Sequence, residues 1–425
     1  MPEPLLLPRS GSPELIIDRT GFLSALAQLT EGRGAIAIDA ERASGYRYSQ
    51  RAYLIQIFRR GGGLHLIDPI AVSDPDLWAE MNLAFADCEW IIHASTQDLP
   101  CLRELGIFPE LLFDTELGGR IAGCERVGLG PLSESLLDLQ LAKEHSAVDW
   151  SIRPLHLDWL TYAALDVDVL IDLRDAVEVL LVERGKLEWA REDFAQILRN
   201  PPPPPRIDPW RRTSGMHKVR DRMTLAIIKA LWYARDEFAR TIDIAAGRIF
   251  NDEILIEVAT KRPATIDEFV KIIKRRSRIP NPPTTEWFAI LQSTLLLSDE
   301  DLPILRTPNL GLPQVKLWKD RNPLGHARLT HARAAVIARA EELDLPVENL
   351  ISPEVIRQLA WRSPPDSEIE RYIESTLLAH GARLWQIREV TPVLIAPMRA
   401  TQPLLPPDPP AESETPAESE IPAEE

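Results

Sequence analysis

The hydrophobic positions in the first two hundred residues form short apolar runs between turn residues, together with longer stretches of helical spacing. Short apolar runs bounded by Gly, Pro or Asp predict buried strands, whereas a period near 3.6 predicts helices. The segment 59–63 separates two such runs and predicts a hairpin, and Gly185 is expected to cap a long helix. The pattern predicts strands at 15–17, 34–41, 52–58, 64–68 and 90–94, and helices at 20–29 (with Thr20 as cap), 75–86, 97–105 and 157–184.

Five consecutive prolines, 201–205, interrupt this pattern. Proline favours extended backbone, so the segment predicts a fairly stiff linker between domains. Beyond the prolines, the apolar positions keep a helical period. We expect helices at 217–241, 251–261, 265–275, 284–298, 325–343, 352–361 and 366–380, with a loop-rich bridge over 299–320.

The charge of the chain is unevenly distributed. The net charge of −16 over 425 residues is unusual for a nucleic-acid-binding protein, but the charge differs between segments of the chain. Residues 210–290 hold 16 Lys and Arg against 10 Asp and Glu, a local charge of +6. This stretch predicts a basic binding module, although a solvated surface with chance asymmetry would give the same count. The acidic, proline-rich tail 401–425 has no aromatic residue and is expected to be disordered.

The composition also predicts a cytoplasmic protein. The chain has no run of 18 apolar residues, and its first residues lack the basic start and apolar core of a signal peptide. Its three cysteines show no metal-ligand spacing, and so low and odd a count fits a reducing compartment. These observations argue against a membrane-spanning protein and against a cysteine-ligated metal site.

Four carboxylates lie near the ends of three predicted elements. Asp39 and Glu41 end an apolar strand, and alternate side chains of a strand share a face. Asp98 follows another apolar strand, and Asp166 lies one helical turn after Tyr162. Mg²⁺ prefers oxygen ligands, and two such ions can clamp both oxygens of an in-line phosphoryl displacement. The four acids therefore predict a paired-metal site. Any one of them alone could instead be a structural carboxylate: Asp98, for example, could be favoured by a helix N-terminus, with Ser95 three residues earlier as the cap.

Together with their flanks, these residues resemble the ribonuclease D family of the DEDD exonuclease superfamily. The D-x-E at 39–41, the lone Asp98 and the Y-x-x-x-D at 162–166 are similar to the three motifs of the branch with tyrosine in the third. The resemblance covers roughly residues 13–200. The flanking matches are Tyr53–Phe58, Leu66–Pro69, His93–Asp98, Lys143, Ser146, Asp149–Trp150 and Arg153–Leu155.

The resemblance implies an α/β ribonuclease H-like exonuclease domain, a mixed sheet with flanking helices, followed by all-α helical domains. From residue 34 onward, the predicted order of three strands, a helix, a strand and a helix is the order of that fold. The segment after the prolines resembles an HRDC domain, and a later segment resembles a second, weaker copy. The expected domains are an exonuclease domain at 13–199, a proline-rich linker at 200–209, an HRDC domain at 210–295, a second HRDC-like domain at 300–395 and the acidic tail at 401–425.

The resemblance also assigns roles to individual residues. It implies that Asp39, Glu41, Asp98 and Asp166 hold two Mg²⁺ or Mn²⁺ ions. Tyr162 would orient the attacking water, although a tyrosine there could instead be a core aromatic residue. Lys143 and Arg153 would hold substrate phosphates, although surface cations are common enough to occur there without that role.

The sequence thus predicts a metal-dependent 3′–5′ exoribonuclease. It would trim the single-stranded 3′ end of structured RNA such as tRNA precursors and release nucleoside 5′-monophosphates, while the helical modules hold the body of the RNA. No nucleotide cofactor is expected, because no phosphate-cradling P-loop pattern occurs. Two alternatives stay open: a single-strand DNA exonuclease, and a nonenzymatic RNA-binding scaffold, against which four intact acids argue.

Overall fold

The computed structural model describes residues 2–9, 11, 13–142, 148–275, 277, 279, 282–306, 311–362 and 366–399. The predicted phosphate ligand Lys143 and the acidic tail 401–425 lie outside these residues. The chain divides into two compact units near residue 308. The segments predicted as the exonuclease and first HRDC domains both belong to the first unit, so the boundary between them stays a prediction.

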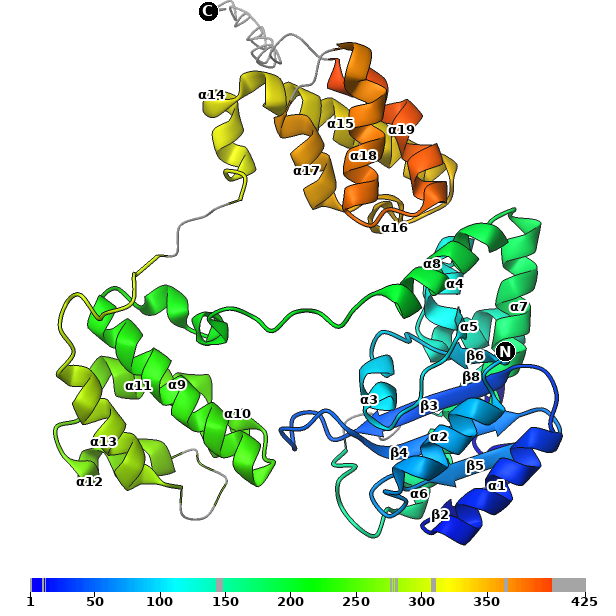
Figure 1. The fold of residues 1–425 in the computed structure, drawn as a ribbon, viewed down its shortest axis with the longest axis horizontal. Helices are drawn as coiled ribbons and strands as arrows, with labels where there is room; N and C mark the ends of the chain where they lie inside the picture. Colours follow the sequence, from blue (N-terminus) through cyan, green and yellow to red (C-terminus); the bar gives the residue numbers. More distant parts are fainter. Residues whose placement is uncertain are drawn as a thin grey trace, which may run out of the picture. The chain divides into compact units, whose positions relative to one another are not determined.

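A six-stranded mixed sheet forms the centre of the exonuclease segment (Figure 1). Its strand order is β2-β5-β4-β3-β6-β7, in which the β5-β4-β3 neighbours are antiparallel and the remaining pairs are parallel. The central strands are apolar on both sides, as expected of strands that helices cover on both faces. The strands are β2 (Leu15–Ile16), β3 (Ile36–Arg42), β4 (Ala52–Arg59), β5 (Gly63–Ile67), β6 (Glu89–Ile92) and β7 (Leu111–Asp114); β1 (Glu3–Leu5) and β8 (Leu139–Leu141) pair separately.

Helices lie on both faces of this sheet. Figure 1 shows α1 and α2 on one face and α6 on the other, where α6 contacts β3, β4 and β5. The mixed sheet with flanking helices confirms the predicted fold class. The helices of this segment are α1 (Arg19–Glu31), α2 (Pro75–Ala84), α3 (Leu99–Glu104), α4 (Thr115–Ala122), α5 (Leu129–Leu137), α6 (Leu157–Asp168), α7 (Leu170–Glu183) and α8 (Leu187–Arg199).

Two local predictions were wrong. The cap of α1 is Asp18 rather than Thr20, because the Asp18 carboxylate accepts a hydrogen bond from the backbone N–H of Gly21. The single helix predicted over 157–184 is two helices that meet at Val169. Apolar residues on both sides of the break are buried. The hydrophobic pattern therefore continues across the break and does not indicate that the helix ends there.

The hairpin predicted at 59–63 is confirmed. Arg59 pairs with Gly63 across the turn between β4 and β5. Gly61 and Gly63 have positive φ angles, which glycine adopts without a Cβ clash. A Cβ on Gly62 would lie 2.8 Å from the Cα of Leu29, so a side chain at this position would collide with the backbone of α1.

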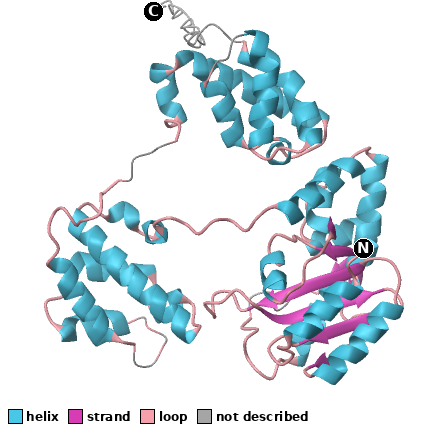
Figure 2. Cartoon of the chain, in the orientation of Figure 1, coloured by secondary structure: helices cyan, strands magenta, loops and turns pink. Residues whose placement is uncertain are grey.

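The rest of the described chain is helical, and Figure 2 shows strands only in the exonuclease segment. In the first unit, the helices after the prolines surround a core that includes Leu231, Phe250, Phe269 and Trp287. They are two short 3₁₀ helices (Pro209–Arg212 and Met216–Lys218), α9 (Arg222–Ile242), α10 (Ala246–Ile249), α11 (Asp252–Lys261), α12 (Ile266–Lys274) and α13 (Thr284–Leu295).

The second unit is a bundle in which α15 packs against α17 and α19. The last helix was not predicted, and it contains Pro392 and Pro397, which disfavour a helix interior. Its buried Trp385, Val390 and Leu394 supply the tertiary packing that outweighs this local cost. The helices are α14 (Trp318–Arg321), α15 (Pro323–Glu342), α16 (Val347–Leu350), α17 (Pro353–Trp361), α18 (Ile369–Ala379) and α19 (Leu384–Met398), with 3₁₀ turns at Val315–Leu317 and Asp366–Glu368.

None of the helices in the described residues is long and apolar enough to span a bilayer.

Candidate active site

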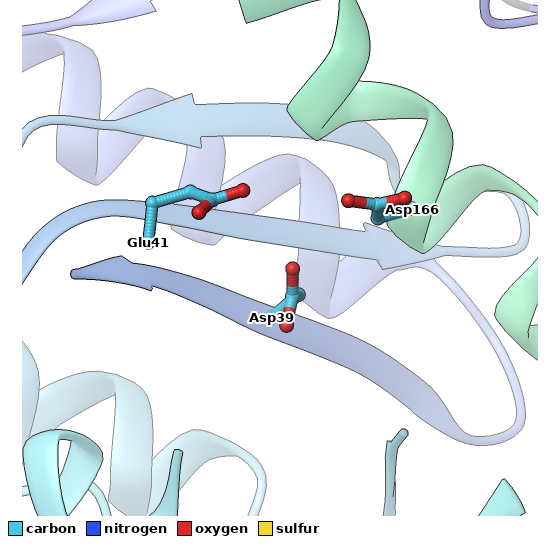
Figure 3. A group of neighbouring side chains, drawn as sticks. All are labelled: Asp39, Glu41 and Asp166. Carbon is cyan, nitrogen blue, oxygen red and sulfur yellow. The ribbon is translucent and has the colours of Figure 1, made fainter. Parts of the chain in front are cut away.

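Three of the four predicted acids meet above the centre of the sheet. Asp39 and Glu41 project from the same face of β3, and Asp166 comes from α6, which covers that face. One carboxylate oxygen from each residue lies within 4.8 Å of the others. Figure 3 shows the three carboxylates pointing toward one another. The structure therefore gathers residues that are up to 127 positions apart in the chain, as the sequence predicts.

The fourth acid, Asp98, lies beside this group at the start of α3. It is buried and shares a hydrogen bond with Asp39, and its carboxylate lies 3.5 Å from the guanidinium of Arg42. Asp98 makes no side-chain hydrogen bond that caps α3. Ser95, the candidate cap three residues before Asp98, instead donates its backbone N–H and hydroxyl to Asp114. The geometry thus favours a role for Asp98 in the acidic group over the helix-cap alternative.

A cavity of about 480 Å³ opens over these acids. Tyr162 lines it together with Asp166, one turn further along α6. His93 and Gln97, from the segment that leads into α3, also lie on its wall. The other described lining residues are Asp39, Ala40, Glu41, Arg42, Ala94, Asp98, Leu129, Gly130, Pro131, Leu141, Ala142 and Leu170.

Burial makes negative charge costly in this cavity. Burial raises the pKa of Asp39 and, together with repulsion from Asp39, raises the pKa values of Glu41 and Asp166 well above their usual range. The same two causes raise the pKa of Asp98 to about 8. Burial and the nearby Asp166 carboxylate also raise the pKa of the Tyr162 phenol, which therefore keeps its proton. Four mutually repelling acids at one place are typical of a functional site.

The donor set fits a hard divalent cation. All four groups offer carboxylate oxygens, the ligand type that Mg²⁺ and Mn²⁺ take in proteins. A bound dication would offset the repulsion among these carboxylates and so reverse the local preference for neutral acids. The arrangement therefore supports a metal-dependent site, and the assignment of individual ligands stays a prediction.

Arg42 is a residue in the cavity that the sequence did not single out. It follows the D-x-E directly, and in a regular strand its side chain would point away from the face of Glu41. The pairing of β3 with β4 shifts between Glu41 and Arg42, at the last residue of β3, and both side chains line the cavity. The arginine next to the motif was visible in the sequence, but its direction was not.

Arg153, predicted to hold a substrate phosphate, is instead bonded within the protein. Its guanidinium donates two hydrogen bonds to the buried Asp68, at 2.6 and 2.9 Å, and another to the carbonyl of Tyr53. Two further bonds go to the carbonyls of Trp150 and Ile152. Asp68 also accepts backbone N–H groups at the turn that follows β5, as expected of a turn residue. These contacts favour a structural role for Arg153 in fixing the segment before α6.

We therefore expect Arg153→Ala to reduce stability rather than catalysis. Removing the guanidinium leaves a buried carboxylate without its cation, which costs about 2–4 kcal/mol of unfolding free energy. Urea denaturation measures this loss, and the rate of nucleotide release per folded molecule should stay close to wild type. Arg191→Ala, which removes an exposed ion pair on α8, is the matched control and should cost less than about 1 kcal/mol. A lower rate with unchanged stability would restore the phosphate-binding role.

Comparison with known families agrees with this geometry. Residues 15–181 match the family described as 3′-5′ exonuclease, and residues 224–278 match the HRDC domain. Residues 311–398 match a third family, described as 3′ to 5′ exonuclease C-terminal domain. The predicted second HRDC-like domain overlaps this third match. Its relationship to the HRDC domain stays a prediction.

Curated relatives extend the match to nearly the whole chain. Ribonuclease D of Acidiphilium cryptum is 28% identical over 352 residues, which cover 79% of this chain and 87% of the relative. Ribonuclease D of Gluconacetobacter diazotrophicus is 26% identical, with 84% and 89% of the two chains covered. This chain belongs to the ribonuclease D family. It is accordingly a 3′–5′ exoribonuclease, and the resemblance seen in the sequence motifs is confirmed.

Solved structures share the fold of this chain. A protein from Bifidobacterium adolescentis is 36% identical, with a TM-score of 0.83 over 94% of this chain and all of that one. Escherichia coli RNase D, at 22% identity, has a TM-score of 0.61 and covers 86% of this chain and 99% of its own. The second likeness shows the shared fold. The ribonuclease D architecture, an exonuclease domain followed by helical domains, therefore describes this chain.

Proposed function

We propose that this ribonuclease D-family protein trims the single-stranded 3′ ends of structured RNA in the cytoplasm, with tRNA precursors among its substrates. Hydrolysis would use two Mg²⁺ ions, or Mn²⁺ in their place, and release nucleoside 5′-monophosphates. The observation that carries the proposal is the group of four acids, one buried and three partly buried, that share one cavity with Tyr162.

Asp39, Glu41, Asp98 and Asp166 would hold the ions. Bound divalent ions supply an activated water and offset the charge that develops on the phosphate and on the leaving 3′ oxygen. Tyr162 stays protonated, because the pKa of its phenol is raised, so it acts as a hydrogen-bond donor rather than as a base. From α6 its hydroxyl can orient the attacking water, or an oxygen of the substrate phosphate, for in-line displacement.

The size of the cavity supports attack at an end of the chain. At about 480 Å³ it falls within the range of roughly 300–1,000 Å³ typical of small-molecule sites. Such a space suits a terminal nucleotide and its phosphate rather than a duplex. An RNA whose 3′ end is paired would therefore have to present a single-stranded tail.

The helical module after the prolines is the candidate binding site for the folded body of the RNA. Residues 210–290 carry a local charge of +6, and part of the affinity for phosphates comes from counterions released on binding. Such an RNA would contact the protein at two sites, with its 3′ end at the metal site and its folded part at the helical module. The enzyme would therefore prefer structured RNA with a 3′ tail to short single strands.

The decisive experiment compares labelled substrates that differ in only one respect. A hairpin RNA with a single-stranded 3′ tail should release mononucleotides stepwise in Mg²⁺ and release none when a chelator removes the metal. The same tail on a DNA hairpin should react more slowly, and raising the salt should weaken binding of the RNA hairpin more than that of the tail alone. Equal rates on DNA would support the DNA-exonuclease alternative, and no release from either substrate would support a binding scaffold.

A further inference from the structure

The acidic cavity contains a positively charged side chain of its own. Arg42 is the only lysine or arginine among the described residues that line the cavity. Its side chain is 25% exposed, and its guanidinium lies 3.5 Å from Asp98. A cation in this position has access both to a predicted metal ligand and to the space in which the substrate must lie.

Arg42 reaches the cavity from the last residue of β3. There the pairing with β4 becomes irregular: Glu41 pairs with Leu54 and Arg42 pairs with Ala52, so Tyr53 is an extra residue on β4. The Arg42 side chain lines the cavity and lies beside Asp98. It therefore places a fixed positive charge in a wall that also holds the four acids.

The charges of the site indicate what Arg42 does once the site is loaded. In the metal-free protein, Arg42 partly offsets the negative charge of the acidic group. If Asp98 held a divalent cation, its carboxylate would be less available to Arg42, which would stay in the cavity. A guanidinium is always charged, and its planar fork matches two oxygens of a phosphate. The anion that reaches this cavity in the reaction is the phosphate of the RNA 3′ end.

We propose that Arg42 is a substrate-binding residue that pairs with Asp98 before metal loading and binds the phosphate of the last internucleotide linkage afterwards. This assignment rests on the proposed function of the same site. It separates Arg42 from Arg153, whose donors are bonded to Asp68 and to backbone carbonyls.

The test uses the full chain with Arg42→Ala and measures two quantities whose changes should have opposite signs. Calorimetric titration of the metal-free protein with Mn²⁺ should show affinity raised by at least about threefold, because a repelling charge near the ligands is gone. The value of kcat/KM for a 3′-tailed RNA should fall by roughly 10- to 100-fold, the size of a lost charge-assisted hydrogen bond. General damage to the site would lower both quantities, which would overturn the proposal.

Two further variants sharpen the result. Arg42→Lys keeps the charge but not the planar fork, so its Mn²⁺ affinity should match wild type while kcat/KM lies between wild type and Arg42→Ala. Arg47→Ala is the matched control: Arg47 lies in the segment between β3 and β4, but its side chain bonds Ser151 and does not line the cavity. It should change neither quantity.

The outcomes separate this assignment from the proposed function. If wild type is active and Arg42→Ala keeps kcat/KM within about twofold, smaller than the loss of even one weak hydrogen bond, the assignment is wrong and the proposed function stands. If wild type releases no nucleotide under any metal, the proposed function fails, and the phosphate-binding role fails with it.

Discussion

Replacing Asp39 or Asp166 with Asn should lower the rate of nucleotide release by more than about 100-fold. Mutating a residue that only hydrogen-bonds to a metal ligand already lowers metal affinity or activity by about 10–100-fold. An amide is a poorer ligand than a carboxylate for a hard dication. The measurement is release of labelled mononucleotide from a 3′-tailed RNA in excess Mg²⁺. Near-wild-type rates in either variant would refute the metal-ligand assignment.

The same variants should not lose stability in the absence of metal. Burial disfavours charge at both positions, and repulsion from Asp39 adds to it at Asp166, so a neutral amide removes an unfavourable interaction from the folded state. We expect the Tm of the metal-free variants to equal or exceed that of wild type, and the rise in Tm on adding Mg²⁺ to be reduced. Asp158→Asn, at an exposed position on the same helix as Asp166, is the control and should leave rate and stability unchanged.

Tyr162→Phe should lower kcat by roughly 10- to 10³-fold, the range for a positioning or proton-donating group. The phenylalanine keeps the ring and loses only the hydroxyl, so RNA affinity and Tm should change little. Steady-state kinetics on a 3′-tailed RNA and thermal unfolding measure both effects. Tyr372→Phe, which removes a half-buried hydroxyl from the second unit, should leave kcat unchanged. A lower Tm with normal turnover per folded molecule would instead identify Tyr162 as a core aromatic residue.

The elements of the exonuclease segment were predictable where the local signal was strong. The strands near 36–42, 52–59 and 63–67 and the hairpin between the last two follow from apolar runs and glycines. The hydrophobic pattern of residues 107–142 did not predict the elements found there, which are β7, α4, α5 and β8. The break at Val169 was also missed, because buried residues on either side of it continue one hydrophobic pattern.

The sequence predicted which residues belong to the candidate site, but it predicted only some of the contacts between them. The shared face of Asp39 and Glu41 follows from the two-residue period of a strand, which is a local property. The approach of Asp98 and Asp166 could be inferred only through the family motifs, since nothing local brings α3 and α6 to β3. The pairing of Arg153 with Asp68, 85 positions away, favours the structural alternative for this arginine and could not be read from local sequence.

By itself, the sequence determined the class of the protein, the strands and helices with strong periodicity, and the acids that are predicted to carry the chemistry. These depend on residue type and short-range spacing, which one chain displays directly. The tertiary structure decided which charges meet. It brought the four acids to one cavity, bonded Arg153 to Asp68 and placed Arg42 beside Asp98. Those outcomes depend on long-range packing, because elements that are far apart in the sequence supply the groups that meet.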